Sequence, residues 1–103
     1  MKILIAGHRY ELANFEHSEK MGQALQFIEK RPGEAPGTLV TTRDGTTNEE
    51  VLRVLIDRIS SLNAKFPCRE NSIALTHVET ALLWLQKRTA DRVARGVEGQ
   101  AKV

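Results

Sequence analysis

Hydrophobic and polar positions follow a strand-like pattern up to Gly45 and a helical pattern after it. Before Gly45, short apolar or β-branched stretches alternate with turn residues; the stretches are 2–6, 10–15, 25–28 and 37–42. Stretches of this kind, bounded by Gly and Pro, are typical of strands and hairpins. We therefore predict a small antiparallel β region over residues 1–45. We expect a loop at 17–24 and a mobile loop at the Pro/Gly-rich segment 31–37.

The first predicted helix begins after Gly45. Two overlapping pairs, Thr46 with Glu49 and Thr47 with Glu50, have the spacing of a capping box, in which side chains bond the free backbone N–H groups of a helix start. The apolar positions that follow recur at helical spacing and are Val51, Leu52, Leu55, Ile56, Ile59 and Leu62. We expect this helix to end around 63–64, because a residue that precedes a proline, here at 66–67, avoids the helical conformation.

The second predicted helix begins at 67–70 and ends before Gly96, since glycine favours the position that follows a helix. Its apolar positions are Ile73, Ala74, Leu75, Val78, Ala81, Leu82, Leu83, Trp84 and Leu85. They occupy more than one side of the helix, so more than one side must be buried. One side can pack on the first helix in an antiparallel hairpin. The other side needs the β region or a second subunit.

The resulting fold class is α+β, with a small N-terminal antiparallel β region followed by a C-terminal two-helix antiparallel hairpin. The length of 103 residues fits a single domain, 1–103, that comprises the β region 1–45, the helical hairpin 46–95 and a tail 96–103. A domain of this size is marginally stable alone, which favours self-association.

The composition excludes several kinds of site. The single cysteine, Cys68, rules out an internal disulfide framework and a cysteine zinc cage. The three histidines lack the spacing of a metal site, and the chain contains neither a Gly-rich phosphate loop nor a paired-histidine motif. We therefore expect no metal, no cofactor and no catalytic residue. The longest apolar runs are too short for a transmembrane helix, so no membrane partner is expected.

The charge is nearly balanced, with a formal net charge of +2. A protein that binds long nucleic acids usually carries a larger basic excess, so a nucleic-acid partner is not expected. Basic residues are nevertheless concentrated near the C-terminus, at Lys87, Arg88, Arg92, Arg95 and Lys102. An accessory protein that binds nucleic acid through this basic helix is therefore the alternative function. A structural interaction module without a ligand is a third possibility.

Residues 66–84 carry a motif, and its positions are Pro67, Arg69, Glu70, Ser72, Ala74, Leu75, Thr76, Glu79, Ala81 and Trp84. In this order they resemble the helical-hairpin domain shared by anti-CBASS cyclic-nucleotide sponges and the Thoeris anti-defence sponge. The resemblance covers residues 46–92, and no matching motif is recognised in 1–45. Cys68 stands where the family pattern prefers Ser, so the expected N-cap hydroxyl is missing.

The resemblance implies a non-enzymatic phage protein that acts in the cytoplasm of the infected bacterial host. Such a sponge forms a homo-oligomer, which we expect to be a dimer or a trimer of dimers. It sequesters cyclic nucleotide second messengers, either cyclic di- or trinucleotides or cyclic ADP-ribose isomers. The ligand is expected at subunit interfaces, because a two-helix hairpin alone cannot enclose it.

The helix starts supply the first candidate ligand residues. Arg69 lies in the first turn of the second helix, where free N–H groups and the helix dipole favour a phosphate. The alternative is that Arg69 has no ligand and is a solvated arginine paired with Glu70 or Glu79. The polar residues that open the first helix can bind phosphate or base edges in the same way, although capping alone explains them. They are Thr46, Thr47 and Asn48.

The other candidates are basic or aromatic. The segment after the first strand contributes a possible hydrogen-bond donor to phosphate, a cation and the single tyrosine of the chain. These residues are His8, Arg9 and Tyr10. Tyr10 can stack on a base or pack half-buried on the sheet. Arg88 shares a helix face with Arg92, and the two can hold an anion, pair with carboxylates of a neighbouring subunit or lie on a solvated face. For Trp84, which lies among leucines, we favour core or interface packing.

Overall fold

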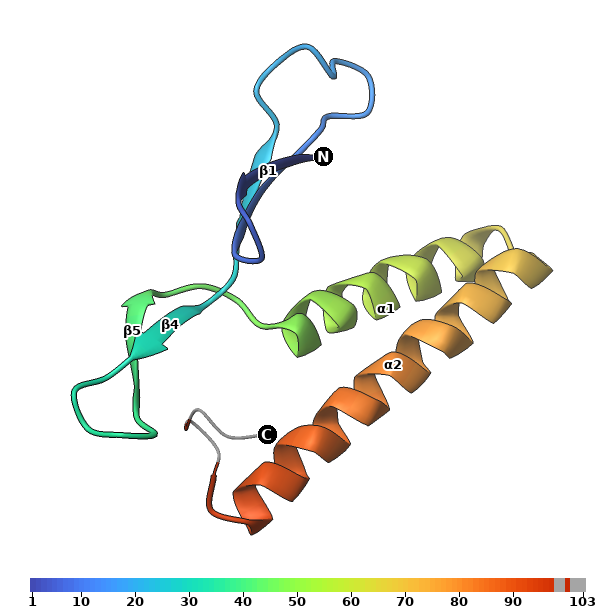
Figure 1. Ribbon diagram of the computed structural model, residues 1–103. Coiled ribbons are helices and arrows are strands. Elements are labelled where there is room, and N and C mark those ends of the chain that lie inside the picture. Colours follow the sequence, from blue (N-terminus) through green and yellow to red (C-terminus); the bar gives the residue numbers. More distant parts are fainter. Residues whose placement is uncertain (98–99, 101–103) are drawn as a thin grey trace. The chain divides into compact units, whose positions relative to one another are not determined.

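The computed structural model describes residues 1–97 and 100, and the chain forms two compact units, Met1–Thr47 and the chain from Asn48 onward. Five strands in antiparallel pairings make up the first unit and two helices make up the second (Figure 1). The predicted α+β class, with an N-terminal β region before a helical hairpin, is confirmed. In the described part of the chain, neither helix is apolar over enough length to span a bilayer.

Three strands form the first sheet, in the antiparallel order β1-β2-β3; they are β1 (Lys2–Ile5), β2 (Arg9–Leu12) and β3 (Gln23–Gln26). Gly7 turns the chain between β1 and β2 with a φ of 78°, a conformation that favours glycine. The prediction of a loop through 17–24 is wrong at its end, because Gln23 pairs with Leu12 and Ala24 with Glu11. These two residues lie on an exposed edge strand that has no apolar alternation, so the pattern did not reveal them.

The second sheet is a hairpin of β4 (Glu29–Pro32) and β5 (Leu39–Arg43). The predicted loop 31–37 therefore begins two residues too early, since its first two residues belong to β4. The carboxylate of Glu29 is buried at 6% exposure and accepts a hydrogen bond from Thr42 Oγ1 at 3.1 Å. Arg31 Nη2 lies 3.7 Å from the same carboxylate. Polar pairing across the hairpin replaces the apolar alternation that marks an ordinary strand.

The helical unit is an antiparallel hairpin of α1 (Asn48–Lys65) and α2 (Arg69–Ala94) (Figure 1). Its partly buried apolar positions recur at helical spacing, which marks the faces that pack together; they are Val51, Leu52, Ile56, Ile59, Leu75, Val78, Leu82 and Leu85. Gly96 follows α2 with a φ of 71°, and its N–H donates to the Val93 carbonyl at 3.0 Å. The predicted termination of α2 at Gly96 is therefore confirmed.

Asn63 and Cys68 fix the corner between the two helices. The Asn63 side chain accepts the Cys68 N–H at 3.0 Å and donates to Ser72 Oγ at 3.0 Å. Cys68 is the N-cap of α2, and its thiol accepts the N–H of Asn71 at 3.4 Å. The family hydroxyl is thus replaced by a sulfur acceptor, and the cap itself is retained. The hydroxyl is absent, as the sequence indicates, and the Cys68 thiol takes its place.

Neither unit has an enclosed apolar core within the described residues, where no apolar side chain is buried. Large apolar side chains lie exposed on both helices; they are Val54, Leu55, Leu62, Ile73, Leu83, Trp84 and Val93. Trp84 is 66% exposed, so core packing of Trp84 within this chain is wrong. The hairpin covers one face of each helix, as predicted, while Leu83, Trp84 and Val93 of α2 stay exposed among the described residues.

Candidate functional site

The eight predicted ligand residues lie in three places. Four belong to the sheet unit around Phe27, namely His8, Arg9, Tyr10 and Thr46. Three lie at the two helix starts, namely Thr47, Asn48 and Arg69. The eighth, Arg88, lies in the last third of α2.

The group around Phe27 is held by one aromatic contact and a set of backbone hydrogen bonds. The rings of Tyr10 and Phe27 meet edge to face, with centroids 6.0 Å apart and an interplanar angle of 85°. The Phe27 N–H donates to the His8 carbonyl at 2.7 Å. Tyr10 is therefore half-buried against the sheet, with its ring fixed beside a second aromatic side chain.

Thr46 joins this group through a parallel bridge to Phe27. The Thr46 N–H donates to the Gln26 carbonyl at 2.8 Å, and the Thr46 carbonyl accepts the Ile28 N–H at 2.9 Å. Gly45 allows this approach, because a Cβ at that position would lie 2.5 Å from the Gln26 oxygen. Arg9 extends the group, since its Nη1 donates to Gln26 Oε1 at 3.3 Å.

Gln26 and Phe27 were not among the predicted site residues. Gln26 supports two members of the group, because its amide nitrogen also donates to the Phe27 carbonyl at 2.7 Å. Their only sequence signal is the short run 25–28, which predicts a strand and nothing about its neighbours. The contact with Thr46 joins residues almost twenty positions apart, which no periodic pattern encodes.

The start of α1 settles which capping box has the right register. The helix begins at Asn48, which places Thr47 at the N-cap position and Glu50 at the third helical position, as in the second predicted box. The first predicted box, of Thr46 with Glu49, is wrong because Thr46 lies in the bridge to Phe27. Asn48 is exposed.

Arg69 is the first residue of α2 and is exposed. Within residues 1–97 it forms no ion pair with Glu70 or Glu79, the two partners that a structural role would give it. The Cys68 cap occupies only the N–H of the third helical residue. The first N–H groups of a helix have no partner within the helix, so Arg69 lies beside donors that favour an anion.

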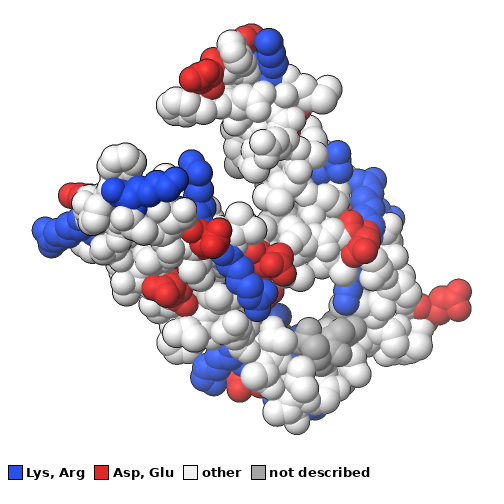
Figure 2. All heavy atoms as spheres, turned by 180° about the vertical axis from the view of Figure 1, so that it is seen from behind, with Lys and Arg blue, Asp and Glu red and all other residues white. Residues whose placement is uncertain are grey.

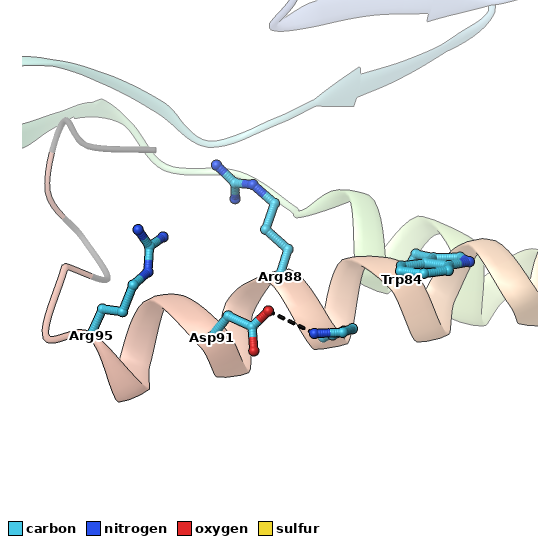
Figure 3. A pocket seen from close by; sticks show the side chains of 5 residues that line it. Trp84, Arg88, Asp91 and Arg95 are labelled. Carbon is cyan, nitrogen blue, oxygen red and sulfur yellow. Dashed lines mark hydrogen bonds and ion pairs between the residues drawn. The ribbon is translucent and has the colours of Figure 1, made fainter.

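Arg88 lines a pocket of about 340 Å³ along the second half of α2 and its C-cap, together with Trp84, Lys87, Asp91 and Arg95 (Figure 3). Lys87 Nζ and Asp91 Oδ2 form an ion pair at 2.9 Å. Arg88 and Arg69 are 19 positions apart on one helix, which corresponds to about 28 Å along its axis. The two arginines therefore belong to separate sites on one copy of the chain. Trp84, Lys87, Asp91 and Arg95 were not predicted as ligand residues.

Arg92 does not share an exposed face with Arg88. It is 5% exposed, and its Nη2 donates to the carbonyls of Val97 at 3.0 Å and Gln100 at 2.7 Å. The expected pairing of Arg88 and Arg92 on one solvated or anion-binding face is therefore wrong. Arg92 instead holds the chain that follows α2 against the end of that helix.

The charges of the basic helix are less available than the sequence indicates. Of its cations, Arg92 is buried and Lys87 is paired with Asp91. Figure 2 shows both basic and acidic side chains among the described residues of each part of the chain. A surface that tracks long nucleic acids would need a continuous basic stripe, so these observations weaken the nucleic-acid alternative.

Two comparisons with known proteins address the family. Residues 25–90, more than half of the chain, match the family described as "Acb2/Tad1, hairpin domain". The match begins in β3 and so extends further toward the N-terminus than the resemblance over 46–92. The chain is also 49% identical over 57 residues to "Thoeris anti-defense 1" of Bacillus phage SBSphiJ7. That alignment covers 54% of this chain and 40% of the relative, so the chain spans less than half of the relative's length.

Proposed function

Because the chain belongs to the Acb2/Tad1 hairpin-domain family, we propose that it is a non-enzymatic phage anti-defence protein that sequesters a cyclic nucleotide immune signal. The ligand classes are cyclic di- or trinucleotides and cyclic ADP-ribose isomers. The protein acts in the cytoplasm of the infected host and keeps the signal intact. The observation that carries this proposal is the match over 25–90, supported by a relative named for Thoeris anti-defence.

The proposed phosphate contact is Arg69. An exposed guanidinium beside a helix N-terminus combines two features that favour phosphate, a charge-assisted donor and a positive dipole end. A hydrogen bond between charged groups of this kind contributes about 1.5–3 kcal/mol. The lack of an ion pair with Glu70 or Glu79 in the described chain leaves this charge available for a ligand.

The group around Phe27 is proposed to contribute further ligand contacts. Arg9 supplies a cation and Tyr10 a flat ring, and His8 lies between them and the turn at Gly7. Thr46 is held in the same group by its bridge, and the next two residues, Thr47 and Asn48, open α1. A cyclic nucleotide presents both phosphates and flat bases, which these side-chain types can bind.

We further propose that the ligand binds where copies of the chain meet. A sponge that competes with a receptor needs roughly nanomolar affinity, or about −12 kcal/mol, and so an enclosing surface. Exposed apolar side chains on α1 and α2, such as Val54 at 62% and Leu83 at 64%, favour burial against another subunit. A dimer or a trimer of dimers would repeat the same arginine around a ligand made of repeated units.

Binding of cyclic dinucleotides, cyclic trinucleotides and cyclic ADP-ribose to the purified protein tests this function. We expect one class to bind, and a ligand at one hundred times its Kd to stabilise the fold by about 2.7 kcal/mol, visible as a rise in Tm. Arg69→Gln should abolish binding, whereas the exposed arginine variant Arg58→Gln should leave it unchanged. Ligand recovered after denaturation should be intact; a linearised product would indicate an enzyme instead.

A further inference from the structure

One face of the first sheet is polar. Side chains alternate between the two faces of a sheet, so Arg9 and Glu11 of β2 share a face. The cross-strand partner of Glu11 on β1 is Lys2, and the partner of Arg9 on β3 is Gln26. The polar face therefore brings together two cations, a carboxylate and a neutral amide.

The carboxylate of this face is paired with Lys2 and not with Arg9. Glu11 is the only acidic residue of the three strands, and its Oε2 lies 3.6 Å from Lys2 Nζ. Among the described residues Arg9 forms no ion pair, although its side chain is half-buried. A cation that is partly withdrawn from water without a counter-ion favours the binding of an anion.

The Gln26 amide holds Arg9 in place without neutralising its charge. Its Oε1 accepts Arg9 Nη1 at 3.3 Å, and its Nε2 donates to the Phe27 carbonyl at 2.7 Å. A guanidinium only donates and a carbonyl only accepts, so these two contacts together fit a single orientation of the amide. The Gln26 backbone is itself anchored, because its carbonyl accepts the Thr46 N–H at 2.8 Å. A carboxylate at this position would bind Arg9 more strongly but would cancel its charge.

We propose that Gln26 is a positioning residue of the cyclic-nucleotide site, which orients the Arg9 guanidinium and leaves its charge available for a ligand phosphate. This inference rests on the proposed function, in which Arg9 is a ligand contact. Gln26 acts through Arg9 and requires no contact with the ligand. An oriented guanidinium can donate two parallel hydrogen bonds to one phosphate, and this geometry is lost when the side chain turns freely.

Calorimetric titration of the full-length protein with cyclic di-AMP, cyclic tri-AMP and cyclic ADP-ribose identifies the probe that binds most tightly, and this probe is used for the variants. Gln26→Glu should weaken binding about tenfold or more, because the new carboxylate pairs with Arg9 in place of a phosphate. Gln26→Met removes the acceptor without adding a charge, so its effect should be smaller. Gln23→Glu is the matched control, since it adds the same charge to β3 opposite Leu12 and should leave the affinity unchanged.

A double-mutant cycle separates positioning from a merely structural role of Gln26. Arg9→Gln alone should weaken binding about as much as Gln26→Glu, and the two changes together should cost no more affinity than Arg9→Gln. Losses that add up, and that follow the loss in Tm, would show that Gln26 only supports the fold. If circular dichroism shows that Gln26→Glu does not fold, the same cycle is carried out with Gln26→Met.

The remaining outcomes distinguish this inference from the proposed function. Unchanged affinity in both Gln26 variants would overturn the positioning role and leave the proposed function standing. An equal loss in Gln23→Glu would show a general effect of negative charge on β3 and would also overturn the role of Gln26. If none of the three cyclic probes binds the unchanged protein, the proposed function and this inference are both wrong.

Discussion

The side chain of Asn63 accepts the backbone N–H of Cys68 at 3.0 Å and thereby joins the end of α1 to the residue that caps α2. The same amide donates to Ser72 Oγ at 3.0 Å, so one side chain holds both sides of the corner. Since Arg69 directly follows the capping residue Cys68, this corner also positions the proposed phosphate contact.

Asn63→Ala should destabilise the protein by about 1–2 kcal/mol, because it removes one acceptor and one donor from the corner. Asn63→Asp keeps the acceptor for Cys68 and loses only the donor to Ser72, so its cost should be smaller. Chemical denaturation of the two variants measures the difference. Equal stability of Asn63→Ala and the unchanged protein would mean that solvent replaces both bonds without cost.

The Cys68 cap predicts a stabilising substitution. Serine is a strong N-cap residue and sulfur is a weak acceptor, so Cys68→Ser should raise stability by about 0.5–1 kcal/mol. Cys68→Ala removes the acceptor for Asn71 and should lower stability by a similar amount. Thermal unfolding in a reducing buffer should give the highest Tm for Cys68→Ser, an intermediate Tm for the unchanged protein and the lowest Tm for Cys68→Ala. The reverse order would show that the thiol does not cap α2.

Gly45→Ala should disrupt the bridge between Phe27 and Thr46, because the new methyl group would lie 2.5 Å from the Gln26 oxygen and 2.6 Å from the Phe27 carbonyl carbon. We expect a loss of about 1–3 kcal/mol and a changed environment of the Tyr10 ring in NMR spectra. Gly7→Asn is the matched control, because open space surrounds Gly7 and asparagine tolerates its positive φ. A mild effect at both positions would contradict the close approach at Gly45.

Arg92→Met keeps much of the side-chain volume but loses the hydrogen bonds to the carbonyls of Val97 and Gln100. Charge-assisted bonds of this kind contribute about 1.5–3 kcal/mol, so the segment after α2 should open more often. Hydrogen exchange at the N–H groups of Gly96 and Val97 should accelerate, while exchange in the middle of α1 should not. Unchanged protection at these two amides would show that the guanidinium does not hold the segment.

Leu83→Glu should shift the protein toward smaller species in size-exclusion chromatography with light scattering. Leu83 is 64% exposed on α2, and a carboxylate at an apolar subunit contact costs several kcal/mol when it is desolvated. Ser60→Glu adds the same charge at an exposed polar position of α1 and should not change the mass. A wild-type protein that is monomeric throughout would contradict the proposed oligomer.

The helices could be predicted from the sequence because their signals are local. Apolar residues at helical spacing, the proline at 67 and the glycine at 96 placed both helices to within a few residues. β4 lacked such a signal, since its buried residue is Glu29 and its stability depends on Thr42 across the hairpin. Gln23 and Ala24 were missed for a related reason, because only their pairing with β2 makes them a strand.

The candidate site was harder to predict, because its contacts join distant residues. Arg88 and Arg92 have the same residue type at helical spacing, yet Arg92 is buried by carbonyls that follow the helix. Those acceptors are backbone atoms, which no sequence motif reports. The residue types at positions 9, 10 and 46 indicated side chains able to contact a ligand. Gln26 and Phe27 bring these three residues together, and only the fold identified them.

The lack of a buried apolar side chain in the described chain has a consequence for how the protein responds to dilution. If the exposed helix faces are covered only in an assembly, part of the folding free energy depends on the amount of protein present. Under the proposed function, each chain made early in an infection, when few copies exist, would then be both less stable and less able to bind the proposed ligand. The amount of ligand that the protein can bind would rise more steeply than its copy number. The protein would therefore bind its proposed ligand effectively only above a threshold concentration.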